Sequence, residues 1–118
     1  MSYEVFTIPA FDKAVKRLRK KYRRIKVDLE RVARTLSANP FAGMAIPGFG
    51  QRVWKIRLAS TDMQVGKRGG YRVIYAVDRE KQACYLLYIY AKPEKTDVSA
   101  QELEDLLLEL EAFLYGDE

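Results

Sequence analysis

Positively charged side chains recur between Arg52 and Lys95, and aromatic residues stand among them. The cations and rings that this segment offers for chemistry are Lys55, Arg57, Lys67, Arg68, Arg72, Lys92 and Lys95, with Trp54, Tyr71 and Tyr90. Proteins hold single-stranded RNA on basic surfaces that also carry rings on which bases stack. The combination therefore indicates a polyanionic partner and favours RNA among the polyanions.

The spacing predicts that part of this charge converges on one surface. Residues 52–58 alternate as a strand does, which places Trp54, Ile56 and Leu58 on one face and Val53, Lys55 and Arg57 on the other. Arg72 begins the next expected strand, beyond a loop that contains Lys67 and Arg68. The three glycines of that loop either let the backbone approach a phosphate closely or simply shape a turn.

Several other chemistries are excluded by residue type. The chain has no histidine, which excludes histidine-based nucleases and triad hydrolases. It has neither the Cys and His clusters of a zinc site nor the glycine spacing of a nucleotide-binding loop. The carboxylates of the second half show no ligand pattern for Mg²⁺, so no metal and no cofactor is expected; they are Asp78, Glu80, Glu94 and Asp97.

Charge is unevenly distributed over the 118 residues, whose net charge is +5. Residues 13–34 hold eleven basic and two acidic side chains, whereas residues 97–118 hold eight acidic side chains and no basic one. This asymmetry favours a polyanion as partner of the front and middle of the chain. With no apolar run of membrane-spanning length and no signal-peptide pattern at Met1–Phe11, a cytoplasmic protein is expected.

The first half of the chain predicts one strand and two helices. Residues 3–8 are rich in β-branched and aromatic side chains and end at Pro9, which indicates a strand. Apolar residues then recur at helical spacing over residues 11–22 and 25–36, so a hairpin of two amphipathic helices is expected. Residues 41–50 are interrupted by Gly and Pro and indicate a loop.

The second half predicts an antiparallel meander and a final helix. The expected strands cover residues 52–58, 71–77 and 83–91, the last of which is apolar on both faces and so expected inside the sheet. Ser99 and Glu102 have capping-box spacing before a leucine-rich helix. The expected fold is α+β, a single domain in the order β-α-α-β-β-β-α, with helices on one face of an antiparallel sheet.

The final helix carries acidic side chains outside its leucine stripe. They are Glu102, Glu104, Asp105, Glu109 and Glu111. They either dock near the basic sheet or helices, or form a solvated outer face.

Three ordered segments resemble one protein family. Val53–Leu58, Gly66–Tyr75 and Leu87–Lys95 are similar to the RelE/HigB branch of the RelE/ParE toxins of type II toxin–antitoxin systems. The similarity extends from about Arg52 to Glu102, and it implies one RelE-like domain over residues 1–118. Two residues depart from the pattern, Arg68 in place of a small residue and Pro93 in place of a polar one, and both bear on substrate preference.

The resemblance implies an enzyme that cuts mRNA in the ribosomal A site, an mRNA interferase, silenced by a cognate antitoxin. The implied partners are therefore the antitoxin, the ribosome and mRNA, with no membrane and no small-molecule cofactor. The family's basic active-site residues correspond to Lys55, Arg57, Lys67, Arg72, Tyr90 and Lys92. Further RNA contacts are expected at Trp54, Arg68, Tyr71 and Lys95.

Such an enzyme needs no metal, because RNA contains its own nucleophile, the 2′-hydroxyl. It needs only a base, stabilisation of the phosphorane and a proton for the leaving 5′-oxygen. A lysine among other cations is favoured in its neutral form and can replace histidine as the base. The expected roles are Lys92 or Lys67 as base, Arg72 with Arg57 on the phosphorane, and Tyr90 stacking on or orienting a nucleobase.

Two other functions remain open from the sequence. A gyrase-poisoning toxin of the ParE branch would share the fold, but the presence of Lys55, Arg57, Arg72 and Lys92 argues against it. A non-catalytic module that binds RNA or DNA would require only the same basic and aromatic surface. Turnover of RNA separates such a module from an enzyme.

Overall fold

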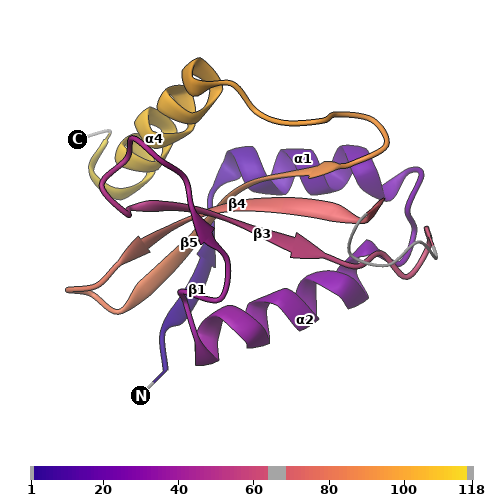
Figure 1. Ribbon diagram of the computed structural model, residues 1–118, viewed down its shortest axis with the longest axis horizontal. Helices are drawn as coiled ribbons and strands as arrows, with labels where there is room; N and C mark the ends of the chain where they lie inside the picture. Colours follow the sequence, from indigo (N-terminus) through magenta and orange to yellow (C-terminus); the bar gives the residue numbers. More distant parts are fainter. Residues whose placement is uncertain (1, 64–68, 117–118) are drawn as a thin grey trace.

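A computed structural model describes residues 2–63 and 69–116 (Figure 1). The elements in chain order are β1 (Glu4–Thr7), α1 (Pro9–Arg19), α2 (Ile25–Ala38), β2 (Met44–Ala45), β3 (Val53–Leu58), β4 (Tyr71–Asp78), β5 (Ala83–Ala91) and α4 (Ala100–Tyr115). The predicted α+β class and the predicted order of helices and main strands are confirmed. The short strand β2 is an addition, because it falls within the segment expected to be a loop.

The strands form one five-stranded sheet in the order β1-β5-β4-β3-β2. Strands β3, β4 and β5 form the predicted antiparallel meander, and β5 lies inside the sheet as expected. The expectation of a wholly antiparallel sheet is wrong at one edge, where β1 runs parallel to β5. Only a short turn obliges neighbouring strands to be antiparallel, and the connection from β1 to β5 contains both hairpin helices and the other strands.

The α1–α2 hairpin covers one face of the sheet, which we call the hairpin face. Helix α1 buries Phe11, Ala14 and Leu18, and α2 buries a matching stripe at helical spacing. Side chains that β3 and β4 direct to this face meet the hairpin; the ring of Tyr71, for example, lies edge-on to Tyr22 with 5.7 Å between centroids. Burial of these apolar stripes is the main favourable term that holds the two layers together.

Helix α4 packs on the other face, so the expectation that all helices share one face is wrong. Its capping box is confirmed, with the Ser99 hydroxyl accepting from the Glu102 N–H and the Glu102 carboxylate accepting from the Ser99 N–H. In Figure 1, α4 (yellow) and α2 (purple) lie on opposite sides of the strands. Helix α4 lies over the Ala76 and Tyr85 end of its face. The other end, defined by Lys55, Arg57 and Arg72, is here called the basic face.

Within the described residues, no helix is both long enough and apolar enough to cross a membrane.

Candidate nucleic-acid interface

Three polar side chains form a lateral row across the basic face. Arg57 of β3 lies directly opposite Arg72 of β4, and Arg72 lies directly opposite Tyr90 of β5. Directly opposed residues have Cβ atoms about 4.5–5.5 Å apart. Lys55, two residues before Arg57 on the same strand, points to the same face. The alternation predicted for residues 52–58 is therefore confirmed over Val53–Leu58, and it brings four of the predicted site residues together.

The guanidinium of Arg72 is held at the centre of this row. The residue is only 6% exposed, and its Nη1 donates to the carbonyl of Tyr71 at 3.1 Å. Burial, followed by the nearby charge of Arg57, lowers the pKa of Arg72. An arginine nevertheless stays protonated at neutral pH, so Arg72 presents a fixed, partly desolvated positive charge. Such a charge attracts a phosphate more strongly than an equally placed solvated one.

Tyr90 has a different position from the one expected. Its ring is 2% exposed and stacks on Tyr88 with 6.3 Å between centroids, so it is not available to stack on a nucleobase. Burial, with the Asp97 carboxylate as the second cause, raises the pKa of Tyr90 to about 12. The hydroxyl therefore stays protonated at neutral pH and acts as a hydrogen-bond donor, 3.5 Å from Oδ1 of Asp97.

Asp97 is the residue of this site that the sequence did not reveal. Its Oδ1 accepts from Nζ of Lys55 at 3.1 Å and from the Val98 N–H at 2.8 Å. The Val98 N–H, and after it Lys55, lowers the pKa of Asp97, so the carboxylate is ionised at neutral pH. In the sequence, Asp97 was only one of four carboxylates without a metal pattern. No periodicity links it to Lys55, which lies 42 residues earlier.

The two remaining predicted lysines separate. Lys92 lines the same cavity as Arg72, and its Nζ donates to the Thr96 carbonyl at 2.8 Å. The Nζ of Lys95 instead donates to Glu102 at 3.0 Å, which ties it to α4. The backbone N–H of Lys92 donates to the Gly70 carbonyl, which joins the end of β5 to the start of β4. The structure therefore brings Lys92 to the basic face and leaves Lys95 beside it.

These side chains line a cavity of about 890 Å³. Its basic-face wall consists of Lys55, Arg57, Arg72, Lys92 and Asp97. The cavity continues around the β3 edge to α2, where Arg31 and Thr35 line it. It is large enough for a nucleotide with its flanking phosphate, because ligand pockets of this kind span about 300–1,000 Å³.

Two aromatic residues predicted to contact RNA lie on the hairpin face instead. Tyr71 is fully buried, and its hydroxyl is 3.2 Å from Oγ of Ser60. Trp54 is 9% exposed, packs its ring against Phe41 and Tyr75, and donates its indole N–H to the Gln51 carbonyl. The structure therefore places Trp54 and Tyr71 in the core and not on a surface open to RNA, because the alternation that directs Lys55 and Arg72 to the basic face directs their neighbours to the hairpin face.

A buried carboxylate anchors the base of the glycine loop. Asp28 of α2 has no exposed surface, and it accepts from the backbone N–H of Thr61 at 3.0 Å and also from the Thr61 hydroxyl. Arg31 donates both to Asp28 and to the Ala59 carbonyl. Asp28 and Arg31, two of the charged residues of the helix hairpin, therefore hold residues 59–61 in place. No pattern of residue types indicates this role, because Asp28 stands among exposed cations.

Gly70 closes the other end of that loop against β3. A Cβ atom at this position would lie 2.2 Å from the Leu58 carbonyl oxygen, so a side chain is sterically excluded there. Lys67 and Arg68, predicted as catalytic and RNA-binding residues, lie outside the described residues.

The acidic side chains of α4 were expected either to dock near the basic sheet or helices or to form a solvated outer face. Glu102 pairs with Lys95, whereas Glu104, Asp105, Glu109 and Glu111 are exposed. The solvated outer face is therefore the better description.

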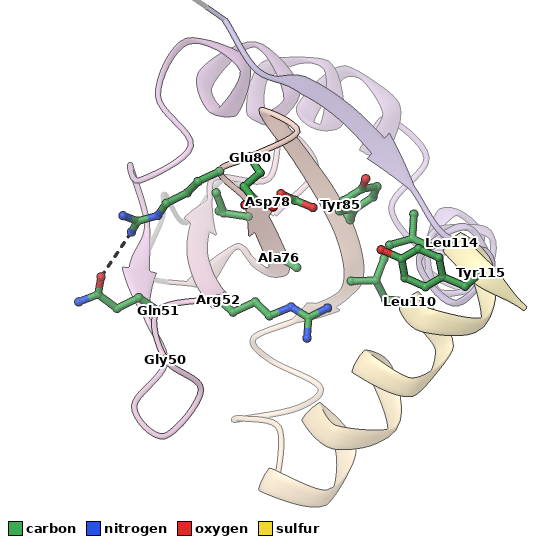
Figure 2. Close-up of a pocket in the computed structure, with 12 residues that line it drawn as sticks. Gly50, Gln51, Arg52, Ala76, Asp78, Glu80, Tyr85, Leu110, Leu114 and Tyr115 are labelled. Atoms are coloured by element: carbon green, nitrogen blue, oxygen red, sulfur yellow. Dashed lines mark hydrogen bonds between the residues drawn. The ribbon is translucent and has the colours of Figure 1, made fainter.

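A second pocket, of about 400 Å³, lies beneath α4, on the sheet face that also carries the basic face but at its opposite end (Figure 2). It is lined by Arg52, by Asp78 and Glu80 of the β4–β5 turn, and by the α4 residues Leu110 and Tyr115, among others. Figure 2 shows the Arg52 side chain extending toward Leu110 and Tyr115. Of the predicted catalytic residues that the structure describes, none lines this pocket, whereas Arg57, Arg72 and Lys92 line the cavity at the basic face.

Comparison with known proteins decides the family. The family model described as "RelE toxin of RelE / RelB toxin-antitoxin system" matches residues 10–112. The chain belongs to the RelE toxin family. The resemblance seen in its three sequence segments is thereby confirmed.

Solved structures of RelE toxins have the same fold. The RelBE2 toxin–antitoxin complex from Mycobacterium tuberculosis contains a chain similar to this one with a TM-score of 0.59 at 18% identity, covering 82% of this chain and 95% of that one. A mutant of the E. coli toxin RelE in the free state gives a TM-score of 0.55 at 20% identity, covering 92% and 94%. The isolated E. coli RelE toxin gives a TM-score of 0.53 at 19% identity, covering 90% of this chain and 97% of that one. At these identities the likeness establishes the fold.

Proposed function

We propose that this RelE-family chain is a ribosome-dependent endoribonuclease that cuts mRNA in the A site without a metal. The observation that carries the proposal is the row of Arg57, Arg72 and Tyr90, flanked by Lys55 and Lys92 in one open cavity. Cleavage through the 2′-hydroxyl places negative charge on a phosphorane, and fixed cations aimed at that charge supply the main stabilisation.

Arg72 and Arg57 take the phosphorane role. Their planar forks bind phosphate oxygens in pairs and keep their charge throughout the reaction. The direct pairing of Arg57 with Arg72 across β3 and β4 supports a shared contact of both side chains with one phosphate.

Lys92 or Lys67 acts as the base that accepts the 2′-hydroxyl proton. The 2′-oxygen then bonds to phosphorus, the bond to the 5′-oxygen breaks, and that oxygen receives a proton. The products are a 2′,3′-cyclic phosphate and a 5′-hydroxyl end. Tyr90, buried and protonated, positions Asp97 by its hydroxyl and does not stack on a base.

The proposed partner is a cognate antitoxin protein. Support comes from the family and from the M. tuberculosis relative, whose structure was solved as a toxin–antitoxin complex. The antitoxin would prevent the basic face from cleaving mRNA.

The test adds purified protein to translating ribosomes and maps new mRNA 5′ ends. The proposal expects cuts inside the A-site codon, and it expects Arg72→Ala to lose them. Because Arg72 is buried, circular dichroism must show that the variant is folded, and Arg34→Ala serves as the exposed-arginine control. Intact mRNA with DNA breaks would indicate gyrase poisoning, and RNA binding without cuts would indicate a binding module; either result contradicts the proposal.

A further inference from the structure

Asp97 is chemically out of place in a site for a polyanion. Among the described residues that line the basic cavity it is the one acidic side chain, facing Lys55, Arg57, Arg72 and Lys92. Its side chain is 65% exposed, so its charge is directed at the space that RNA would enter and is not buried in the core.

The contacts of Asp97 imitate those of a bound phosphate. One oxygen, Oδ1, receives the Lys55 ammonium at 3.1 Å, the Tyr90 hydroxyl at 3.5 Å and the Val98 N–H at 2.8 Å. A phosphate oxygen is typically held by the same kinds of donor: an ammonium, a hydroxyl and a backbone N–H. The Lys55 charge is therefore already neutralised by the protein itself.

An exposed ion pair of this kind contributes little to folding. The ion pair instead affects the binding of RNA, because a phosphate that contacts Lys55 must either displace Asp97 or lie next to a second negative charge. Both alternatives weaken every RNA complex at this site. The penalty is tolerated only when other contacts hold the RNA nearby, since they raise its effective concentration at the site.

We propose that Asp97 is a specificity-determining residue: its carboxylate is an internal counter-ion of Lys55 that disfavours free RNA and reserves the site for mRNA presented by the ribosome. This inference rests on the proposed function. It adds that selectivity for ribosome-held RNA is partly built into the basic face.

The test compares Asp97→Asn with Asp105→Asn, which removes the same charge from the exposed surface of α4. Asparagine keeps an oxygen that can accept from the Val98 N–H, so the local turn is retained. Binding of a single-stranded oligonucleotide of 2′-O-methyl RNA, which cannot be cut, is measured by fluorescence anisotropy at several KCl concentrations. Asp97→Asn should bind severalfold more tightly than Asp105→Asn. Its salt slope should steepen by about 0.7, the value for one added phosphate contact on a single strand.

A second pair of variants separates the Lys55 contact from general repulsion. In a Lys55→Gln background, Asp97→Asn should gain clearly less affinity than in the wild-type background, because the competition for Lys55 is gone. The ratio of free-RNA cleavage to ribosomal cleavage should also rise in Asp97→Asn.

The outcomes distinguish this inference from the proposed function. If Asp97→Asn and Asp105→Asn bind the oligonucleotide equally, or if neither binds, the inference is overturned even when ribosomal mRNA is cut. An undiminished gain in the Lys55→Gln background also overturns it. If Asp97→Asn binds more tightly but no variant cuts mRNA on ribosomes, the binding role of Asp97 stands and the enzymatic function fails.

Discussion

The two faces of the sheet use adjacent residues of the same strands for opposite purposes. In β4, Tyr71 points to the hairpin face and bonds to Ser60, whereas Arg72 points to the basic face between Arg57 and Tyr90. Both residues are nearly inaccessible, at 0% and 6% exposure. Burial alone therefore does not distinguish the core from the site, and the side of the sheet does.

The molecule holds a basic cluster without losing its fold because its two sheet faces have different surroundings. The hairpin face supplies the apolar burial, with Tyr71 and Tyr75 fully enclosed. On the other side of the sheet, α4 lies over the Ala76 and Tyr85 end, and its Leu103 lines the cavity at the basic face. Among the cations of the basic face, Arg57 is exposed and Lys55 partly exposed, which lowers the cost of their repulsion with the buried Arg72.

The largest effect is expected from truncating the hairpin face. Tyr71→Ala should lower the free energy of unfolding by about 3–5 kcal/mol, because it opens a cavity in a closely packed layer. Urea unfolding followed by circular dichroism measures this loss. Tyr71→Phe, which removes only the hydroxyl bonded to Ser60, should cost about 1 kcal/mol. Similar small losses in both variants would show that the ring is not part of the core.

Next in size is the effect of removing an exposed cation from the basic face. Arg57→Ala should reduce the rate of mRNA cleavage on ribosomes by about 100-fold, the usual cost of deleting one charge-stabilising donor. Its melting temperature should be unchanged, because Arg57 is exposed. Arg34→Ala, an exposed arginine on α2, is the matched control. Equal cleavage by the two variants would remove Arg57 from the site.

A smaller effect on stability is expected from removing Asp28, which joins α2 to Thr61. Asp28→Ala should destabilise the protein by about 1–3 kcal/mol, because the Thr61 N–H and Arg31 lose a buried acceptor. Denaturant midpoints of this variant and of Glu30→Ala, an exposed acid on the same helix, measure the difference. If the two midpoints agree, Asp28 does not anchor the loop.

The smallest effect concerns pH. The Ser99 N–H, and after it Lys95, lowers the pKa of Glu102 in the folded protein. A lowered folded-state pKa contributes stability above the pKa of the unfolded chain, and this stability is lost as the pH falls through the folded-state value. Between pH 6 and 3, the melting temperature of the wild type should therefore fall slightly more than that of Glu102→Gln. Glu104→Gln, an exposed neighbour, should follow the wild type.

Local patterns predicted the parts of this molecule that depend on local physics. The alternation predicted for residues 52–58 is confirmed over Val53–Leu58, and so is the Ser99–Glu102 capping box, because the first follows from strand backbone geometry and the second from hydrogen bonds at one helix end. The direction of β1 was missed, since its pairing with β5 is set by packing across almost the whole chain.

The sequence predicted the cations of the site but not the residues that contact them. A period of two residues separates Lys55 from Trp54 but does not say which face a helix covers. Tyrosine fits core and surface alike, so the burial of Tyr71 and Tyr90 left no signal in the sequence. Asp28 and Asp97 act through residues more than 30 positions away, at Thr61 and Lys55, which only the folded chain brings near.

The basic face is proposed to cleave RNA through the 2′-hydroxyl. This proposal is tested most directly by adding the protein to ribosomes that carry one of two mRNAs. One mRNA is natural, and the other has a 2′-deoxy nucleotide at each position of the A-site codon. Cuts with 2′,3′-cyclic phosphate ends are expected in the natural mRNA, and none in the deoxy codon. Cleavage of both codons at equal rates, or of neither, would contradict it.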